Sequence, residues 1–126
     1  MKLEFLASGS PDCPLIRLYD FDNAAVVLLR EVFRRLSDAS VSNTPLHEQK
    51  AIEAVDGCRL DLRLGSRDSG IVQTGPLRFE CILTTEGWSE VVDLMEPFCE
   101  SENMKGYQWL NEDGEVSLLL SPGGLW

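Results

Sequence analysis

Apolar residues recur at helical spacing in two segments of the chain, and the first segment is residues 22–37. Its apolar side chains fall on one stripe of a helix. The stripe consists of Ala25, Leu28, Leu29, Val32 and Leu36. Asp22 is suited to cap the N-terminus, while Arg34 and Arg35 lie in the last turn, where positive charge complements the helix dipole. These signals together predict a helix from Asp22 to about Ser37.

A second helix is predicted from about Glu86 to Glu96, with Thr85 as its N-cap. Its apolar positions follow the i, i+3, i+4, i+7 spacing of a helix that buries one face. These positions are Trp88, Val91, Val92 and Met95. Pro97 has no backbone N–H and crowds the preceding turn, so the helix is expected to end or kink there.

The remaining apolar segments alternate with polar residues at a period of two, which is typical of half-buried strands. Residues 58–64 and 77–83 show the clearest alternation. Asp56-Gly57 is a typical hairpin turn, so residues 47–55 are expected to form a strand beside 58–64, although part of that segment also suits a helix. Further strands are expected over residues 3–7, 15–19, 107–110 and 115–120.

The predicted order is therefore strand, strand, helix, three strands, helix, two strands. Short hairpin loops favour antiparallel neighbours, because a parallel pair needs a long crossover. One sheet face is expected to meet water because it carries charged side chains. They are Arg59, Asp61, Arg63, Arg78 and Glu80. The sequence thus predicts an α+β fold with a mainly antiparallel sheet and two helices packed on one face.

The length and composition fit a single α+β domain spanning residues 1–126. A chain of this size buries roughly two-thirds of its surface on folding, which is enough for its own core. With 44% hydrophobic and 25% charged residues, it is not a disordered or disulfide-scaffold sequence. Its longest aliphatic run, residues 24–29, is far shorter than the ~20 residues that cross a bilayer.

The cysteines indicate a reducing compartment. Cys13, Cys58, Cys81 and Cys99 are too widely spaced for a zinc knuckle or a Cys-x-x-Cys redox motif. Cys58 and Cys81 alternate in phase with apolar neighbours, so they are expected to be buried thiols. Glu4 interrupts the apolar start of the chain, which argues against a secretory signal. A cytoplasmic protein is therefore expected.

Negative charge is concentrated in the C-terminal part of the chain. The formal net charge is −10, and residues 79–126 contain ten acids but only one base, Lys105. Nucleic-acid phosphates and anionic membranes would be repelled by such a surface, so neither is expected as a partner. A basic protein partner is compatible with it, and so is a role in solubility alone.

Most catalytic chemistries lack parts in this sequence. Cys13 lies in a predicted turn, but a reactive thiol needs a nearby base or cation, and His47 is the only histidine. A Gly-x-Ser-x-Gly elbow is absent, and no glycine-rich turn opens a helix as a phosphate-binding loop does. No metal site or cofactor is expected either, because the histidine and cysteine ligands are scarce and scattered.

The second predicted helix carries an acidic face. Glu86, Glu90 and Asp93 are spaced i, i+4, i+7 opposite the apolar face, Glu96 borders them, and Glu100 follows the helix. No lysine or arginine occurs in this stretch, so ion pairs within the helix cannot neutralise the charges. The ordinary explanation of such a face is solubility, and the functional explanation is electrostatic capture of a basic partner.

These observations predict a small non-enzymatic protein-binding domain whose acidic half engages a basic protein. An immunity-type inhibitor of a cationic toxin and an adaptor both fit. The binding residues would be Glu86, Glu90, Asp93, Glu96 and Glu100, with Trp126 as a further contact anchor. One alternative is a small hydrolase or transferase that uses Cys13 or a carboxylate cluster. Another is a homodimeric structural domain formed through a sheet face or an edge strand.

Overall fold

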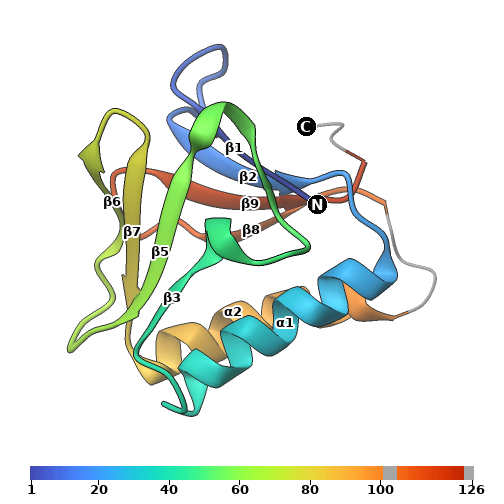
Figure 1. Ribbon diagram of the computed structural model, residues 1–126, viewed down its shortest axis with the longest axis vertical. Coiled ribbons are helices and arrows are strands. Elements are labelled where there is room, and N and C mark those ends of the chain that lie inside the picture. Colours follow the sequence, from blue (N-terminus) through green and yellow to red (C-terminus); the bar gives the residue numbers. More distant parts are fainter. Residues whose placement is uncertain (101–104, 124–126) are drawn as a thin grey trace.

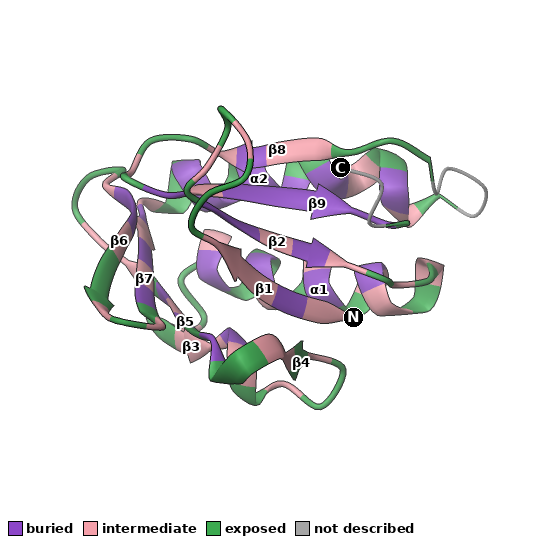
Figure 2. Cartoon of the chain, turned by 90° about the horizontal axis from the view of Figure 1, so that it is seen from above, coloured by how far each residue is buried: buried purple, intermediate pink, exposed green. Residues whose placement is uncertain are grey.

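The computed structural model describes residues 1–100 and 105–123, and it has an α+β architecture of two helices and two mixed sheets (Figure 1). Helix α1 spans Asn23–Ser37 and helix α2 spans Thr85–Cys99. The helices lie side by side beneath the larger sheet (Figure 2). They run antiparallel, because Asn23 at the start of α1 contacts the last turn of α2.

The larger sheet has five strands in the order β4-β1-β2-β9-β8. They are β1 (Lys2–Leu6), β2 (Leu15–Tyr19), β4 (Glu53–Ala54), β8 (Gln108–Asn111) and β9 (Ser117–Ser121). The β1–β2 and β8–β9 pairs are antiparallel. Strand β2 pairs in parallel with β9, and β1 pairs in parallel with β4. Strand β9 therefore lies inside the sheet, beside a strand from the start of the chain.

The smaller sheet has four strands in the order β3-β5-β7-β6. They are β3 (Asn43–Pro45), β5 (Arg59–Leu64), β6 (Gly70–Gly75) and β7 (Arg78–Leu83). Strand β5 pairs in parallel with β7, whereas β3–β5 and β6–β7 are antiparallel. As expected, the apolar residues that alternate with charged ones are buried in the core, namely Leu60, Leu62, Phe79, Cys81 and Leu83. The charged residues lie on the opposite face, exposed or half-buried, and share it with the half-buried Ile82.

The α+β class with two helices is confirmed, but the prediction of a mainly antiparallel sheet holds only in part. Both sheets are mixed, because three of the pairings just described are parallel. The crossover from β2 to β9 contains both helices, and the one from β5 to β7 contains β6. Alternation along a strand fixes the face it buries, but it does not specify which strand lies beside it.

The segment between α1 and β5 differs most from the prediction. Residues 47–55 are not a continuous strand, because a short 3-10 helix (Leu46–Glu48) and turns precede the two residues of β4. Asp56-Gly57 is not a hairpin turn but part of a second short 3-10 segment, in which both residues have positive φ. Strand β4 consequently pairs with β1 and not with β5.

Strands β3 and β6 were not predicted from the sequence. Strand β3 is only three residues long and ends in a proline. Strand β6 begins and ends with glycine and contains exposed Gln73 and Thr74, so its apolar alternation is weak. Neither segment has a strong preference of its own for the strand conformation. Strand β3 is stabilised by pairing with β5, and β6 by pairing with β7.

Helix α1 has the predicted cap and the predicted basic last turn, but its core face is rotated. The Asp22 carboxylate accepts a hydrogen bond from the backbone N–H of Ala25 at 2.9 Å. The core face consists of Val26, Leu29, Phe33 and Leu36. Leu28, which the predicted stripe included, is 60% exposed. The helix carries apolar residues over a wide arc, so the packing of Phe33 on Trp88 of α2 selects which part of that arc is buried.

Helix α2 begins one residue earlier than predicted and continues beyond Pro97. Its N-cap is Thr84, whose hydroxyl accepts a hydrogen bond from the N–H of Gly87 at 3.1 Å. Pro97 lies on the exposed side, where a backbone carbonyl that loses its partner can reach water. The Asn23 side chain donates to the carbonyls of Phe98 and Cys99, which stabilises the last turn.

One buried cluster joins both sheets and both helices. Trp88 is fully buried, stacks on Phe33 with ring centroids 5.5 Å apart, and donates its indole N–H to the carbonyl of Arg63 on β5. The two sheets touch where Gly70 meets Gly114, because a Cβ on either residue would lie under 2.5 Å from backbone atoms of the other strand region. Trp88 thus ties α2 to the smaller sheet, and the glycine contact ties the sheets together.

Candidate functional site

The outward side of α2 presents three acidic residues in a row. Glu86, Glu90 and Asp93, which we call the acidic stripe, are all exposed. The core side of α2 is formed by Trp88, Val91, Val92 and Met95 as predicted, which turns the stripe toward solvent. None of the three carboxylates makes an ion pair with a residue that the structure describes.

Glu96, which was predicted to border the acidic face, forms ion pairs with α1. It faces α1, where its carboxylate lies 2.9 Å from Arg30 Nη1 and 3.8 Å from Arg34 Nη2. The Nε atom of Arg30 is buried and has no hydrogen-bond partner among the described residues, so this guanidinium depends on Glu96 for its compensation. Glu96 therefore connects the two helices, while 45% of its side chain remains exposed.

Of the other two predicted binding residues, Glu100 and Trp126, the structure describes only Glu100. Glu100 is exposed and directly follows the last residue of α2. No ion pair joins it to the residues that are described, so it extends the negative surface beyond the helix. Trp126 lies outside the described residues.

Ion pairs neutralise several acids elsewhere on the molecule. Glu4 binds Arg17 at 2.8 Å across the β1–β2 pair. On the smaller sheet, Glu80 binds Arg63 at 2.6 Å. Glu31 lies within 4.0 Å of guanidinium atoms of Arg34 and Arg35 on α1. The arginines of these ion pairs all precede α2 in the sequence. Glu96 is their one partner on α2, and none of them forms an ion pair with the acidic stripe.

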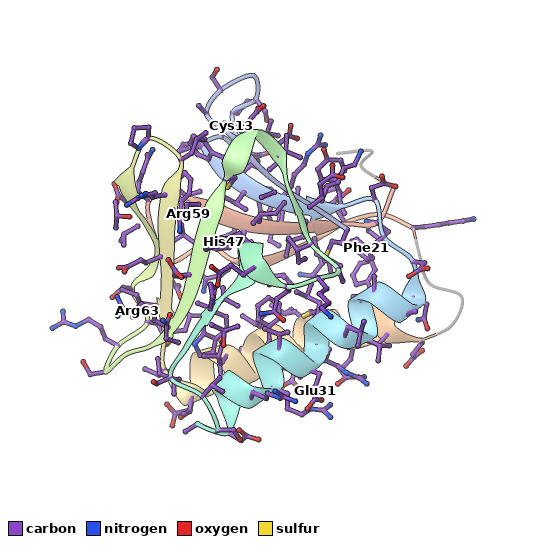
Figure 3. All side chains as sticks on the ribbon, viewed as in Figure 1. Cys13, Phe21, Glu31, His47, Arg59 and Arg63 are labelled. Atoms are coloured by element: carbon purple, nitrogen blue, oxygen red, sulfur yellow. The ribbon has the colours of Figure 1, made fainter. Side chains whose placement is uncertain are left out.

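Cys13 and His47, the residues of the enzymatic alternative, come from different parts of the fold (Figure 3). Cys13 lies in the turn between β1 and β2, where its N–H bonds to the carbonyl of Ser10. His47 lies in the 3-10 helix beside β5, and its Nδ1 accepts a hydrogen bond from the N–H of Leu60 at 3.0 Å. That bond gives the histidine a structural role, because it pairs a backbone donor of β5.

The remaining cysteines are free thiols in apolar surroundings. Cys58 and Cys81 are fully buried, as predicted. Burial raises the pKa of the Cys58 thiol to about 11, with a smaller contribution from the negative charge of Glu4. Burial also raises the pKa of Cys81 and, less deeply in the core, that of Cys99. A raised pKa leaves little thiolate near neutral pH, so these three thiols are unsuited to nucleophilic chemistry.

An apolar groove, which was not predicted from the sequence, runs beside α1. Its volume is about 510 Å³, and it lies between α1 and the segment from Thr44 to Ile52. The signal for it was present in the sequence, because Ala25, Leu28 and Val32 belong to the predicted apolar stripe of α1. The core uses only part of that stripe, and the groove uses the rest.

Other kinds of site find little support in residues 1–100 and 105–123. No three histidine, cysteine, aspartate or glutamate residues lie close enough there to share a metal ion. Neither helix has the length and apolar character required to span a bilayer. No family model, curated protein or solved structure matches the chain.

Proposed function

We propose that the protein is a small, non-enzymatic binding domain that uses the acidic stripe of α2 to engage a basic surface of another protein. The observation that carries this proposal is the uncompensated exposure of Glu86, Glu90 and Asp93. An immunity-type inhibitor of a cationic toxin and an adaptor for another basic protein are the two roles that fit best.

The arrangement of charges on the helices supports this proposal. A pair of like charges spaced i, i+4 on a helix costs a few tenths of a kcal/mol. The arginines of α1 form ion pairs with Glu96 and Glu31, and no ion pair with a described residue offsets the repulsion within the acidic stripe. A rigid row of carboxylates on a packed helix attracts a cationic surface and accelerates the encounter, with a strong dependence on ionic strength.

The decisive experiment compares two variants that change the net charge equally. The stripe variant carries Glu86→Lys, Glu90→Lys and Asp93→Lys. The control carries Asp12→Lys, Glu53→Lys and Glu115→Lys, at positions that are exposed, lie outside α2 and have no ion pair with the described residues. Each variant is used as bait in a pull-down from the native host, with circular dichroism to verify the fold.

We expect the wild type and the control to recover the same basic protein and the stripe variant to lose it. With the purified partner, the association rate of the wild type should fall steeply as salt is raised. Equal recovery by all three baits would show that the acidic stripe serves solubility and that the proposed function is wrong.

A further inference from the structure

The groove beside α1 is an apolar surface that the fold leaves uncovered. One wall is formed by α1 and the other by the segment from Thr44 to Ile52, with Leu46 buried at its base. The apolar residues that line it are Met1, Ala25, Leu28, Leu29, Val32, Leu46, Ala51 and Ile52. Leu28 is 60% exposed, which makes it the most exposed large hydrophobic side chain in the described part of the chain.

The charged side chains of the groove are balanced, unlike those of the molecule as a whole. Glu31 and Glu48 oppose Arg35 and Lys50 in its lining, so the side-chain charge there sums to zero on a protein of net charge −10. The acidic stripe, by contrast, contains no base. Two copies of a protein with this net charge repel one another, and a contact between copies is least unfavourable where the charged side chains balance.

A two-fold symmetric contact also requires that one surface complement itself. The groove meets this requirement in two ways. Leu28 protrudes from the α1 wall beside a cavity of about 510 Å³, which has room for apolar side chains from another copy. Of the charged lining residues, Glu31 and Arg35 pair within one chain, whereas Glu48 and Lys50 have no ion pair with the described residues and are available to pair with Lys50 and Glu48 of another copy. An anionic or cationic ligand would be favoured by a charge excess of one sign, which these side chains do not have.

We propose that the groove is the interface of a homodimer, in which Leu28 of each protomer inserts into the groove of its partner across a two-fold axis. The sheet edges are less suitable for association. Strands β3 and β4 are three and two residues long, and the other two edge strands pair irregularly, β6 between Gln73 and Gly75 and β8 between Trp109 and Asn111. The acidic stripe lies on α2, outside the lining of the groove, so dimerisation leaves it accessible.

The test is the molar mass of the full chain in solution, measured by sedimentation velocity and by light scattering over a wide range of protein concentration. We expect the wild type to reach the mass of a dimer. Leu28→Glu should weaken the dimer roughly tenfold to a hundredfold, because a buried leucine is replaced by a charge. Leu94→Glu is the matched control, since Leu94 is 36% exposed on α2 and does not line the groove. It should leave the dimer intact.

A second pair of variants tests the charge balance without touching an apolar residue. Lys50→Glu makes the lining net negative in both copies and should weaken the dimer, most clearly at low salt. Arg67→Glu changes the net charge equally, but Arg67 lies outside the groove and should have little effect. A wild type that stays monomeric at every concentration would overturn the proposal and leave the groove to a ligand or another protein. A dimer that survives both Leu28→Glu and Lys50→Glu would also overturn it.

Discussion

Glu90 and Glu96 show how the surroundings of a residue decide what its charge does. Both are glutamates on α2, and the sequence alone places them on or beside the same acidic face. Glu90 points into solvent, whereas Glu96 binds two arginines that precede it by more than sixty residues. Spacing along α2 correctly predicts that Glu90 lies opposite the buried side of the helix. The partner of Glu96 could not be predicted, because it depends on how α1 packs on α2.

This difference predicts opposite effects on stability for two conservative substitutions. Glu96→Gln should lower the free energy of unfolding by about 1 kcal/mol, because the partly buried Arg30 loses its counter-charge. Glu90→Gln should change it by less than about 0.5 kcal/mol, and a small gain is expected from reduced repulsion within the acidic stripe. Urea denaturation of both variants measures the two values. Equal losses would mean that the Arg30–Glu96 contact contributes nothing.

At the scale of elements, both helices could be predicted from their periodicity, although the N-cap of α2 is Thr84 and not Thr85, and strands β3 and β6 could not be predicted. The N-terminus of α2 shows what the sequence lacked. Asp68, which lies in a loop, accepts hydrogen bonds from the N–H and the hydroxyl of Thr84 at 2.8 and 2.9 Å. Thr84 in turn caps the helix. Such a relay between a loop and a cap is a tertiary contact, so no local pattern indicates it.

This relay predicts an unusual response at Gly87. Replacing a glycine inside a helix by alanine ordinarily stabilises the helix by about 1 kcal/mol. Here the added Cβ would lie 2.3 Å from Asp68 Oδ1 and 3.1 Å from the Cβ of Leu83. Gly87→Ala should therefore destabilise the wild type by roughly 1 kcal/mol, because it displaces the Asp68 carboxylate from Thr84.

The cause can be isolated with a double-mutant cycle. In an Asp68→Ala background the close contact with the carboxylate is gone, so Gly87→Ala should cost less or become favourable. Thermal or urea unfolding of the four proteins measures the coupling between the two positions. If Gly87→Ala has the same effect in both backgrounds, Asp68 is not the reason that glycine is needed.

At the scale of the whole molecule, the sequence predicts the class of fold but not its connections. The alternation in residues 58–64 and 77–83 correctly indicates two strands with one buried face each. It carries no information that they pair in parallel, or that β2 and β9 are neighbours. The two candidate surfaces differ in the same way, because one depends on a local pattern and the other on contacts between distant segments. The acidic stripe was predictable from one helix, whereas the groove forms only when a distant segment packs beside α1.

The buried thiols make the stability of the whole molecule sensitive to alkaline pH. Burial raises the pKa of Cys58 from an ordinary value of about 9 to about 11, and it raises the pKa of Cys81 as well. At pH values between about 9 and about 11, the Cys58 thiol loses its proton in the unfolded chain but keeps it in the folded chain. Ionisation of these thiols therefore leaves the free energy of unfolding unchanged below pH 9. That free energy falls as the pH rises toward the pKa of the folded state, by at most about 1.4 kcal/mol per pH unit for each thiol.

Urea denaturation at several pH values from 7 to about 10.5 measures this loss. Lysines and tyrosines also titrate in that range, so the reference is a Cys58→Ala, Cys81→Ala double variant. It should be less stable than the wild type at pH 7, because it leaves space in the core, but its stability should decline less as the pH rises. Parallel declines in the two proteins would contradict the assignment to the thiols.

The interior position of β9 has a consequence for how the protein is made. Until residues 117–121 leave the ribosome, the larger sheet exists as separate pieces, and β2 has an open edge where its last neighbour belongs. An apolar strand with an unsatisfied edge invites pairing with the wrong chain. Residues 1–116 are therefore synthesised before this hazard is removed, and until then the nascent chain exposes an aggregation-prone edge of the kind that chaperones protect.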